Sequence, residues 1–383
     1  MNNVIIVSRS NLRGNSAAAS RIGLYSKAIA LHSDSAVYYV TLPHYTNLKK
    51  DIDYNIHYGT EESDKNYINY FKALNRIIRQ LKGNVTILLY PTTGCFFEIL
   101  IMLWCKFHCY RLICEINEVR KYSSEIKSCS FLRRHVFAIQ ANIQEKLTKY
   151  YSGLICISKN IQQYFNLYNH ISIIVPILTE SQQSISRRNY NEDNSKIRFV
   201  FTGTISIEKE NLIELLYGFK IFLNDSHKDC ELIFYGYIVF NEKKILDKLI
   251  SELNLQENII FKGRVEHSQI PEILRNADCL VLSRSNNKQN YYGFSTKLSE
   301  YLTSGTVTIT TNTGVIGDYL SNNNDCIIVD GYKKEGFKDA FLRFSNMTSE
   351  ERYSMGQNAI KTANACFDYK QFSDPINDFL FTK

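Results

Sequence analysis

Residues 290–320 read NYYGFSTKLSEYLTSGTVTITTNTGVIGDYL. The turn at 293–296 is expected to open a helix, and Gly305 is expected to end it. The β-branched run at 307–311 predicts a strand that leads into a second turn at Gly314. The stretch therefore predicts a helix start beside the strands of an α/β domain.

The start of that helix has the composition of an anion site. Free backbone N–H groups and the helix dipole favour a phosphate or diphosphate there. Lys297 adds a positive charge, and Glu300 can accept hydrogen bonds from hydroxyl groups one turn later. A diphosphate next to sugar hydroxyls describes a nucleotide-sugar, which is the ligand we expect.

The bulk composition indicates a globular protein with two domains. The chain has 383 residues, of which 44% are hydrophobic and 22% charged. A chain of this length usually forms more than one hydrophobic core. Its ten cysteines have no regular spacing, so we interpret them as reduced thiols of a cytoplasmic protein. The group Cys105, His108, Cys109 and Cys114 is interpreted as a helix running into a strand rather than as a metal site.

No segment predicts a secretory signal or a membrane-spanning helix. The longest apolar stretch, 95–105, contains Glu98 and is about half as long as a spanning helix. Positive charge is nevertheless concentrated in one half: residues 1–180 hold 21 Lys and Arg against 12 Asp and Glu. An anionic partner such as a phospholipid or lipid phosphate is one explanation, and an ordinary solvated surface is the other.

One basic and apolar segment is a candidate for peripheral membrane contact. Residues 130–137 read SFLRRHVF, so Arg133 and Arg134 can meet lipid phosphates while Phe131, Leu132 and Phe137 enter the interface. The alternative is that the apolar side chains pack inward. The contact would place the protein at the inner face of the cell membrane.

Strand-like and helix-like segments alternate through both halves, which predicts parallel sheets covered on both faces. Residues 45–64 are expected to be irregular, and the polar segment 179–196 to be a linker. The predicted fold is α/β, with two Rossmann-like doubly wound domains facing a central cleft. The first domain is 1–180, with a terminal helix at 368–383 packing back on it, and the second is 181–367.

Four motifs in the second half occur in a familiar order. They are FTGTISIEK at 201–209, LIFYG at 232–236, IIFKGR at 259–264 with IPEILRNAD at 270–278, and YGFSTKLSE at 292–300. With these motifs the chain resembles the family 4 glycosyltransferases of GT-B fold, especially bacterial members that build capsule or lipopolysaccharide sugars. The resemblance covers about 170 residues, and the first half shares mainly the βα pattern.

The resemblance implies roles for residues of the second half. Lys209 would stabilise charge on the departing diphosphate, Glu300 would accept from the donor ribose, and Lys297 would hold the diphosphate. Structural alternatives stay open, since Gly203 can simply make a turn and Glu300 can simply favour the helix dipole. The implied donor-binding residues are Gly203, Thr204, Lys209, Gly236, Gly263, Arg264, Tyr292, Gly293, Phe294, Ser295, Thr296, Lys297 and Glu300.

Three places depart from the family pattern. The usual Pro after the helix-ending Gly305 is missing, and Thr306-Val307 stands there. Tyr292 stands where the family has the first Glu of its Glu-x7-Glu motif, and tyrosine carries no charge at neutral pH. Thr204 stands where the family usually has Arg, which leaves Lys209 with less cationic help.

Candidate acceptor-side residues lie in the first half. Arg13, Gly14 and Asn15 form the loop after the first predicted strand. Glu115 ends a predicted parallel strand, where such sheets place functional groups, and Glu118 follows it. Either carboxylate can orient the acceptor hydroxyl or act as a base, and each can equally be a structural carboxylate.

The function expected from these residues is that of a hexosyltransferase-type glycosyltransferase. It would move a sugar from a nucleotide-diphosphate sugar to a glycan or lipid-linked glycan, in surface polysaccharide biosynthesis, with no nucleic-acid partner. Resemblance implies retention of configuration and no cofactor or metal, and the chain has no Asp-x-Asp cluster suited to Mg²⁺. The alternatives are a nucleotide-sugar epimerase of the same fold and a non-catalytic binding subunit.

Overall fold

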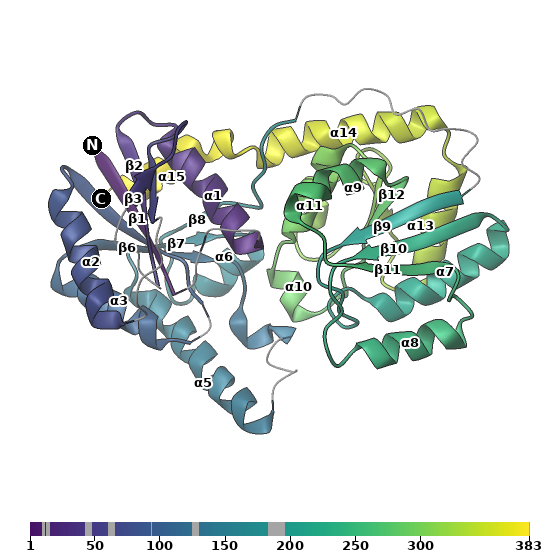
Figure 1. Ribbon diagram of the computed structural model, residues 1–383, viewed down its shortest axis with the longest axis horizontal. Helices are drawn as coiled ribbons and strands as arrows, with labels where there is room; N and C mark the ends of the chain where they lie inside the picture. Colours follow the sequence, from purple (N-terminus) through teal and green to yellow (C-terminus); the bar gives the residue numbers. More distant parts are fainter. Residues whose placement is uncertain are drawn as a thin grey trace. The chain divides into compact units, whose positions relative to one another are not determined.

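The structure is a computed structural model that describes residues 1–9, 12, 16–42, 48–59, 66–92, 94–124, 130–182 and 196–382. The chain divides into two compact units (Figure 1). The first comprises Met1–Leu178 and Asp368–Lys383, and the second comprises Thr179–Phe367. The division falls two residues before the predicted boundary.

The first unit is built on an eight-stranded sheet with the order β3-β4-β2-β1-β5-β6-β7-β8. All neighbours are parallel except β3 and β4, which pair antiparallel. The strands are β1 Asn2–Ser8, β2 Ser35–Thr41, β3 Leu48–Lys50, β4 Ile56–Gly59, β5 Asn84–Leu89, β6 Arg111–Ile116, β7 Gly153–Cys156 and β8 Ser172–Ile174.

The short strands β3 and β4 correct the expectation that residues 45–64 are irregular. Ile56 of β4 pairs with Val37 of β2 and is buried. Neither strand has an alternating run of apolar residues, so local sequence carries little strand signal. The pairing with β2, which is distant in sequence, makes this segment a strand.

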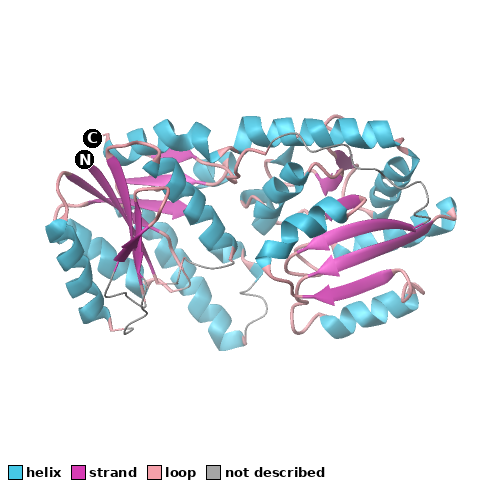
Figure 2. Ribbon diagram, turned by 45° about the horizontal axis from the view of Figure 1, so that its top comes forward, coloured by secondary structure: helices cyan, strands magenta, loops and turns pink. Residues whose placement is uncertain are grey.

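Helices lie on both sides of each sheet (Figure 2). In the first unit, the helix α2 (Tyr67–Gln80) is amphipathic, with Tyr70, Leu74 and Ile78 buried and Asn66 capping its start. The unit also has short 3-10 turns at Arg120–Tyr122 (η1), Thr148–Tyr150 (η2) and Tyr369–Phe372 (η4). Its α-helices include α1 Ala17–Ala30, α2 Tyr67–Gln80, α3 Phe96–Phe107, α5 Phe131–Leu147, α6 Lys159–Phe165 and α15 Ser373–Phe381.

The C-terminal helix α15 completes the core of the first unit. Ile376 and Leu380 are fully buried in the hydrophobic cluster that also contains residues of β1 and α1. Burial of each such side chain contributes about 1.5–3 kcal/mol. The hydroxyl of Ser373 donates to the carbonyl of Ala28 at 2.7 Å, and that of Thr86 donates to the carbonyl of Leu380 at 2.9 Å. These contacts fix the returning chain against α1 and β5.

The second unit has a six-stranded parallel sheet with the order β11-β10-β9-β12-β13-β14. Its strands are β9 Lys196–Thr202, β10 Asp229–Tyr235, β11 Ile259–Gly263, β12 Cys279–Leu282, β13 Thr308–Thr311 and β14 Ile327–Val329. Its helices are α7 Leu212–Ser226, α8 Lys243–Glu252, η3 His267–Gln269, α9 Ile270–Asn276, α10 Lys288–Tyr292, α11 Thr296–Ser304, α12 Ile316–Tyr319, α13 Lys334–Asn346 and α14 Ser349–Phe367.

Aromatic side chains fill one side of this second sheet. Phe199 of β9 is fully buried and meets Phe341 of α13 edge to face, with ring centroids 4.7 Å apart. Phe219 and Phe222 of α7 pack against the same pair. The cluster joins β9, α7 and α13 and anchors the central strand of the sheet.

The strand order of the second sheet reverses next to β9. The chain runs outward from β9 to β10 and β11, then returns to pair β12 with the other side of β9, with Cys279 opposite Phe199. The loops after β9 and β12 therefore lie beside each other at the carboxyl ends of the strands. Open α/β sheets bind ligands at this kind of switch point.

Candidate functional site

Two glycines let the backbones of neighbouring loops approach closely at the switch point. Gly203 follows β9 with a φ of 111°, and its N–H donates to the carbonyl of Tyr235 at 2.7 Å. Gly236 follows β10 with a φ of 146°, and a Cβ there would lie 1.7 Å from the carbonyl oxygen of Gly203. No larger residue fits position 236 without moving the loop after β9.

The helix α11 begins directly beside these loops. Ser295 precedes it, but its side chain makes no capping hydrogen bond to the described residues of the helix. Its hydroxyl instead accepts a hydrogen bond of 2.6 Å from Arg284, which comes from the loop after β12. The helix ends at Gly305, which has a φ of 68°. Arg284 is thus hydrogen-bonded to Ser295, the residue at the N-terminal, positive end of the α11 dipole.

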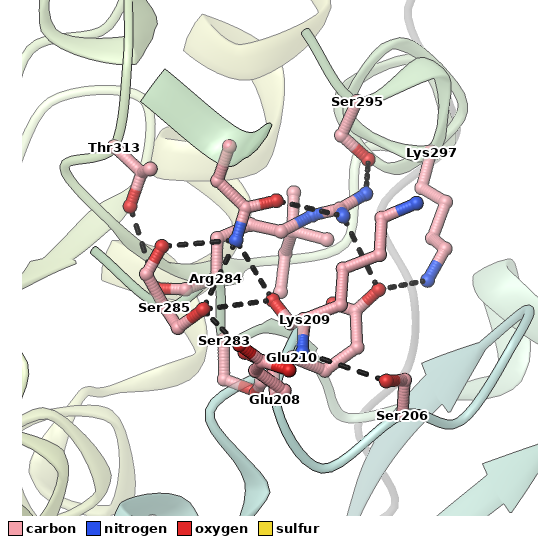
Figure 3. A network of polar contacts seen from close by, with 12 residues as sticks. Ser206, Glu208, Lys209, Glu210, Ser283, Arg284, Ser285, Ser295, Lys297 and Thr313 are labelled. Atoms are coloured by element: carbon pink, nitrogen blue, oxygen red, sulfur yellow. Dashed lines mark hydrogen bonds and ion pairs between the residues drawn. The ribbon is translucent and has the colours of Figure 1, made fainter. Parts of the chain in front are cut away.

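A buried carboxylate lies among the positive charges of this site (Figure 3). Glu210 is 1% exposed, and its Oε1 lies 3.0 Å from Lys297 Nζ and 3.4 Å from Arg284 Nη1. Burial acts to raise the pKa of Glu210, but Arg284, Lys297 and Lys209 outweigh it and hold the pKa below its usual value. Glu210 is therefore ionised at neutral pH.

Lys297 is held in unusual surroundings for an ammonium group. Its Nζ lies 4.0 Å from the centre of the Phe201 ring, and its Cε is 2.5 Å from where a Cβ of residue 203 would be. Burial lowers the pKa of Lys297 to about 8, in spite of the opposing effect of Glu210. The side chain lies beneath the glycine turn, where a phosphate could approach the backbone.

Hydrogen bonds fix the loop that carries Lys209 and Glu210 to the loop after β12. Asn290 of α10 donates to the carbonyl of Lys209 at 2.9 Å, and Ser283 donates to the carbonyl of Glu210 at 2.6 Å. Asn290 also accepts from Arg284 at 3.3 Å. Polar contacts between the two loops therefore hold the backbone that carries the charged side chains of the site.

The structure brings several predicted donor residues together. Gly203, Lys209, Ser295 and Lys297 meet around Glu210, while Thr204 is half-buried in the loop after β9. The remaining predicted residues lie further out. The carbonyl of Gly263 accepts from Gly236 at 2.8 Å, and the Arg264 guanidinium lies 4.5 Å from the Tyr237 ring centroid.

Residues of the quoted motif around α10 and α11 have different surroundings. Tyr292 ends α10 and is half-buried against Tyr291, and Gly293 and Thr296 complete the turn into α11. The ring of Phe294 is buried against Tyr319 and Phe367, so its side chain belongs to the core.

Glu300 lies one turn into α11, next to a histidine from another element. Its Oε1 is 3.5 Å from Nε2 of His267, which belongs to η3. Burial raises the pKa of Glu300, although His267 and Lys297 act in the opposite direction. The carboxylate is partly exposed and can still accept hydrogen bonds from a ligand.

Sequence reasoning missed Glu210, Arg284 and Asn290. Arg284 follows β12 within two residues, so the rule for carboxyl ends of parallel strands would have found it. Glu210 directly follows Lys209, but nothing local distinguishes it from a surface carboxylate. Its partners are 74 and 87 residues away, and only the fold brings them together.

The predicted acceptor-side residues have separate outcomes. Arg13, Gly14 and Asn15 lie outside the described residues. Glu115 is fully buried and accepts from Nε of Arg21 at 2.7 Å, so it is the counter-ion of a buried arginine. This placement favours its structural alternative. Glu118 is half-buried and lines a pocket of the first unit with Glu98.

Neither a metal-binding cluster nor a membrane-spanning helix occurs among the residues that the structure describes. No group of three or more His, Cys, Asp or Glu side chains there could hold a metal ion. None of the described helices is long and apolar enough to cross a membrane.

Residues 182–362 match the model of a protein family described as "Glycosyl transferases group 1". The match contains the whole network around Glu210. No curated protein matches the sequence.

Solved structures match nearly the full length of the chain. One is sucrose-phosphate synthase from Thermosynechococcus elongatus, with 12% identity, a TM-score of 0.68 and coverage of 99% of this chain and 98% of that chain. Anabaena Alr3699/HepE in complex with UDP and glucose has 12% identity, a TM-score of 0.66 and complete coverage of both chains. The chain has the GT-B glycosyltransferase fold. A glycosyltransferase from Rickettsia africae ESF-5 shares this architecture, with 13% identity, a TM-score of 0.67 and coverage of 100% and 99%.

The family match and the GT-B fold together support a glycosyltransferase. They also agree with the predicted fold class, in which each half is a Rossmann-like unit. At 12–13% identity, the structural matches by themselves show the fold.

Proposed function

We propose that this GT-B protein transfers a sugar from a nucleotide-diphosphate sugar to a hydroxyl of a glycan or lipid-linked glycan acceptor. The proposed enzyme is a family 4 hexosyltransferase of bacterial surface polysaccharide biosynthesis, of the capsule or lipopolysaccharide type. One observation carries the donor assignment: the excess of positive charge around Glu210 at the start of α11.

The charge balance of the site supports an anionic ligand. Three cations, Lys209, Arg284 and Lys297, act on the buried carboxylate of Glu210, and the carboxylate of Glu300 lies one turn further along α11, so the cations outnumber the carboxylates. The side chains of Arg284 and Lys297 are only 9% and 16% exposed. Like charges at such burial are costly unless an anion compensates them. The diphosphate of a nucleotide-sugar brings two negative charges, and the N-terminus of α11 adds a favourable dipole.

The same groups suit the proposed reaction. The bond from the sugar to the diphosphate breaks, so negative charge grows on the diphosphate as the transition state forms. Lys209 and Lys297 would stabilise that charge, and Glu300 would hold the ribose by accepting from its hydroxyls. We propose retention of configuration, with the departing diphosphate taking the proton of the acceptor hydroxyl. The contribution of the protein is then positioning and charge stabilisation.

Similar structures support the choice of donor class. Anabaena Alr3699/HepE has structures in complex with UDP and with UDP-glucose. The experiment is a panel of nucleotide-sugars tested by thermal shift, followed by a transfer assay with glycan and lipid-linked acceptors. Stabilisation by one nucleotide-sugar and release of its nucleoside diphosphate are expected. Absence of both with every donor would contradict the proposal.

Tyr292 favours one alternative function. Because it replaces the acidic residue of the family motif, a nucleotide-sugar-binding subunit without turnover is the second candidate. Such a subunit would give the thermal shift but no nucleoside diphosphate with any acceptor. Restoring the acid in Tyr292→Glu should then increase turnover if the position limits catalysis.

We propose that transfer needs no metal ion or other cofactor. Lys209, Arg284 and Lys297 would supply the positive charge that Mg²⁺ supplies to diphosphates in other enzymes. Activity should survive EDTA. Complete loss that Mg²⁺ or Mn²⁺ restores would overturn this part of the proposal.

We propose further that the first unit contacts the inner face of the cell membrane through the start of α5. Phe131 and Leu132 are 73% and 79% exposed, Arg133 and Arg134 are exposed beside them, and Phe137 is half-buried. Exposed apolar side chains next to arginines suit an anionic lipid surface.

Vesicle co-sedimentation tests the membrane contact. Binding to anionic liposomes should be lost at high salt and reduced by Arg133→Glu/Arg134→Glu. The control is Arg76→Glu/Arg79→Glu on α2, which changes the charge equally at another exposed surface of the same unit. Equal binding to neutral liposomes, or equal losses in both variants, would count against the proposal.

A further inference from the structure

Glu210 contributes an unusual carboxylate to the proposed donor site. Its Oε1 is shared by Lys297 and Arg284, whereas its Oε2 has no hydrogen-bond partner among the described residues, although it is buried. A buried carboxylate oxygen without a partner costs free energy. A negative charge inside a site for a diphosphate also repels the ligand. The carboxylate therefore opposes both folding and ligand binding unless it serves its cationic neighbours.

The need for a counter-ion is greatest at Lys297. Its ammonium lies against the Phe201 ring and beneath the backbone of Gly203, where little water can solvate it. The charged groups that act on it are Glu210, Arg284 and Lys209, and the carboxylate of Glu300 one turn later on α11. Two of these four are positive and favour the neutral amine. Glu210 is the carboxylate in direct contact, at 3.0 Å.

We propose that Glu210 is a positioning residue that keeps Lys297 charged and fixed beneath Gly203, so that the donor diphosphate meets a preformed ammonium group. This inference rests on the proposed donor site. In the free protein Glu210 would be the counter-ion, and in the complex the diphosphate would share that role. The shared oxygen also holds Arg284, whose guanidinium donates to Ser295 at the start of α11. One carboxylate thus aligns two cations with the helix terminus.

The proposal predicts how donor affinity depends on pH. The pKa of Lys297 is about 8 in the free protein, and only the charged form pairs with a diphosphate. Affinity should therefore be constant below about pH 7 and fall about tenfold per pH unit well above pH 8. Removing the charge of Glu210 lowers the pKa of Lys297 further, because its main favourable partner is lost. The fall in affinity should then begin at a lower pH.

The experiment compares wild type with Glu210→Gln by calorimetric titration with the nucleotide-sugar that binds wild type best, chosen among UDP-glucose, GDP-mannose and ADP-glucose. Titrations run from about pH 6 to about pH 9, where the diphosphate diester does not titrate. The quantity compared is the midpoint, the pH at which donor affinity has fallen to half of its low-pH value. We expect this midpoint to be at least one pH unit lower in the variant than in wild type. The midpoint is decisive, since loss of a negative charge can also strengthen binding at low pH.

Two further variants control the experiment. Glu214→Gln removes a carboxylate of the same unit that bonds Lys333 and the backbone of Lys334, and its midpoint should stay at the wild-type value. Glu210→Asp keeps the charge but shortens the side chain, so its midpoint should move in the same direction by a smaller amount. If Glu210→Gln does not fold, Glu210→Asp is compared with wild type in its place.

The outcomes separate the inference from the proposed function. If wild type binds none of the three donors at low pH, the donor site itself is wrong. If wild type binds a donor and the midpoints of the folded Glu210 variants equal that of wild type, the positioning role of Glu210 is wrong. Lys297→Arg, whose charge is fixed, should remove the pH dependence, and an unchanged dependence would also overturn the inference.

Discussion

Lys297 occupies the space that a side chain at residue 203 would need. A Cβ at position 203 would lie 2.5 Å from Cε and 3.0 Å from Nζ of Lys297. The glycine after β9 therefore does more than permit a positive φ, because it also admits a cation from α11. The two residues are 94 positions apart and together form the centre of the proposed diphosphate site.

Gly203→Ala should weaken donor binding by displacing Lys297. We expect a loss of about tenfold or more, equivalent to about 1.4 kcal/mol, in a calorimetric titration with the best nucleotide-sugar. Gly331→Ala is the matched control, because Gly331 also has a positive φ of 69° but no atom lies within 4 Å of its added Cβ. Equal effects of the two variants would assign the loss to backbone strain.

Lys209→Ala should lower kcat more than it raises KM. The charge on the departing diphosphate is greatest in the transition state, where an added cation has its largest effect. Steady-state kinetics with saturating acceptor measures both quantities. Lys209→Arg should restore part of the rate, since it keeps the charge but changes its geometry. A raised KM with unchanged kcat would make Lys209 a uniform binding group.

Glu300→Ala should reduce affinity for the intact donor without unfolding the protein. Loss of a charge-assisted hydrogen bond to the ribose should cost about 1.5–3 kcal/mol. Comparison of the ribonucleotide donor with its deoxyribose analogues identifies the partner, because the variant should no longer discriminate between them. Unchanged affinity for the ribonucleotide donor would remove Glu300 from the site.

Local sequence predicts much of the second unit but not the charge network of its site. The motif at 292–300 and the βα pattern were enough to predict the helix α11, its neighbouring strands and the positions of Gly203, Lys209 and Lys297. The network itself was not predictable, because Glu210 and Arg284 become partners only through the reversal of strand order between β9 and β12. Charge balance at a site depends on such long-range neighbours.

The first half shows a different limit. Its Glu115 was correctly placed at the end of a parallel strand, but the pattern could not reveal that Arg21 of α1 buries it. Arg21 also donates to the carbonyls of Val175 and Pro176, so the pair joins three distant segments. Carboxyl ends of strands attract functional and structural charges alike, and only tertiary contacts distinguish them.

Glu98→Gln should stabilise the protein at alkaline pH. Burial raises the pKa of Glu98 to about 7, above its ordinary 4.5. The folded state then holds a proton that the unfolded state has lost, so the stability is complete below about pH 4.5 and falls by up to about 3 kcal/mol as pH rises to 7. Glutamine can still accept from Gln144, which donates to Glu98 at 2.6 Å.

Calorimetric melting at about pH 5 and about pH 8 checks this prediction. Glu98→Gln should raise the melting temperature relative to wild type at the higher pH and have a smaller effect at the lower one. Asp34→Asn, at an exposed position of the same unit, should leave the pH dependence unchanged. Equal shifts at both pH values would show that Glu98 does not titrate in this range.

The most direct test of the donor site is calorimetric titration of wild type and Lys297→Met with UDP-glucose, GDP-mannose and ADP-glucose at neutral pH. Methionine has a similar length but no charge, so the Gly203 turn should keep its conformation. The account predicts that at least one donor binds wild type and that its affinity falls at least about tenfold in the variant. Equal binding to both proteins, or no binding of any donor to wild type, would contradict it.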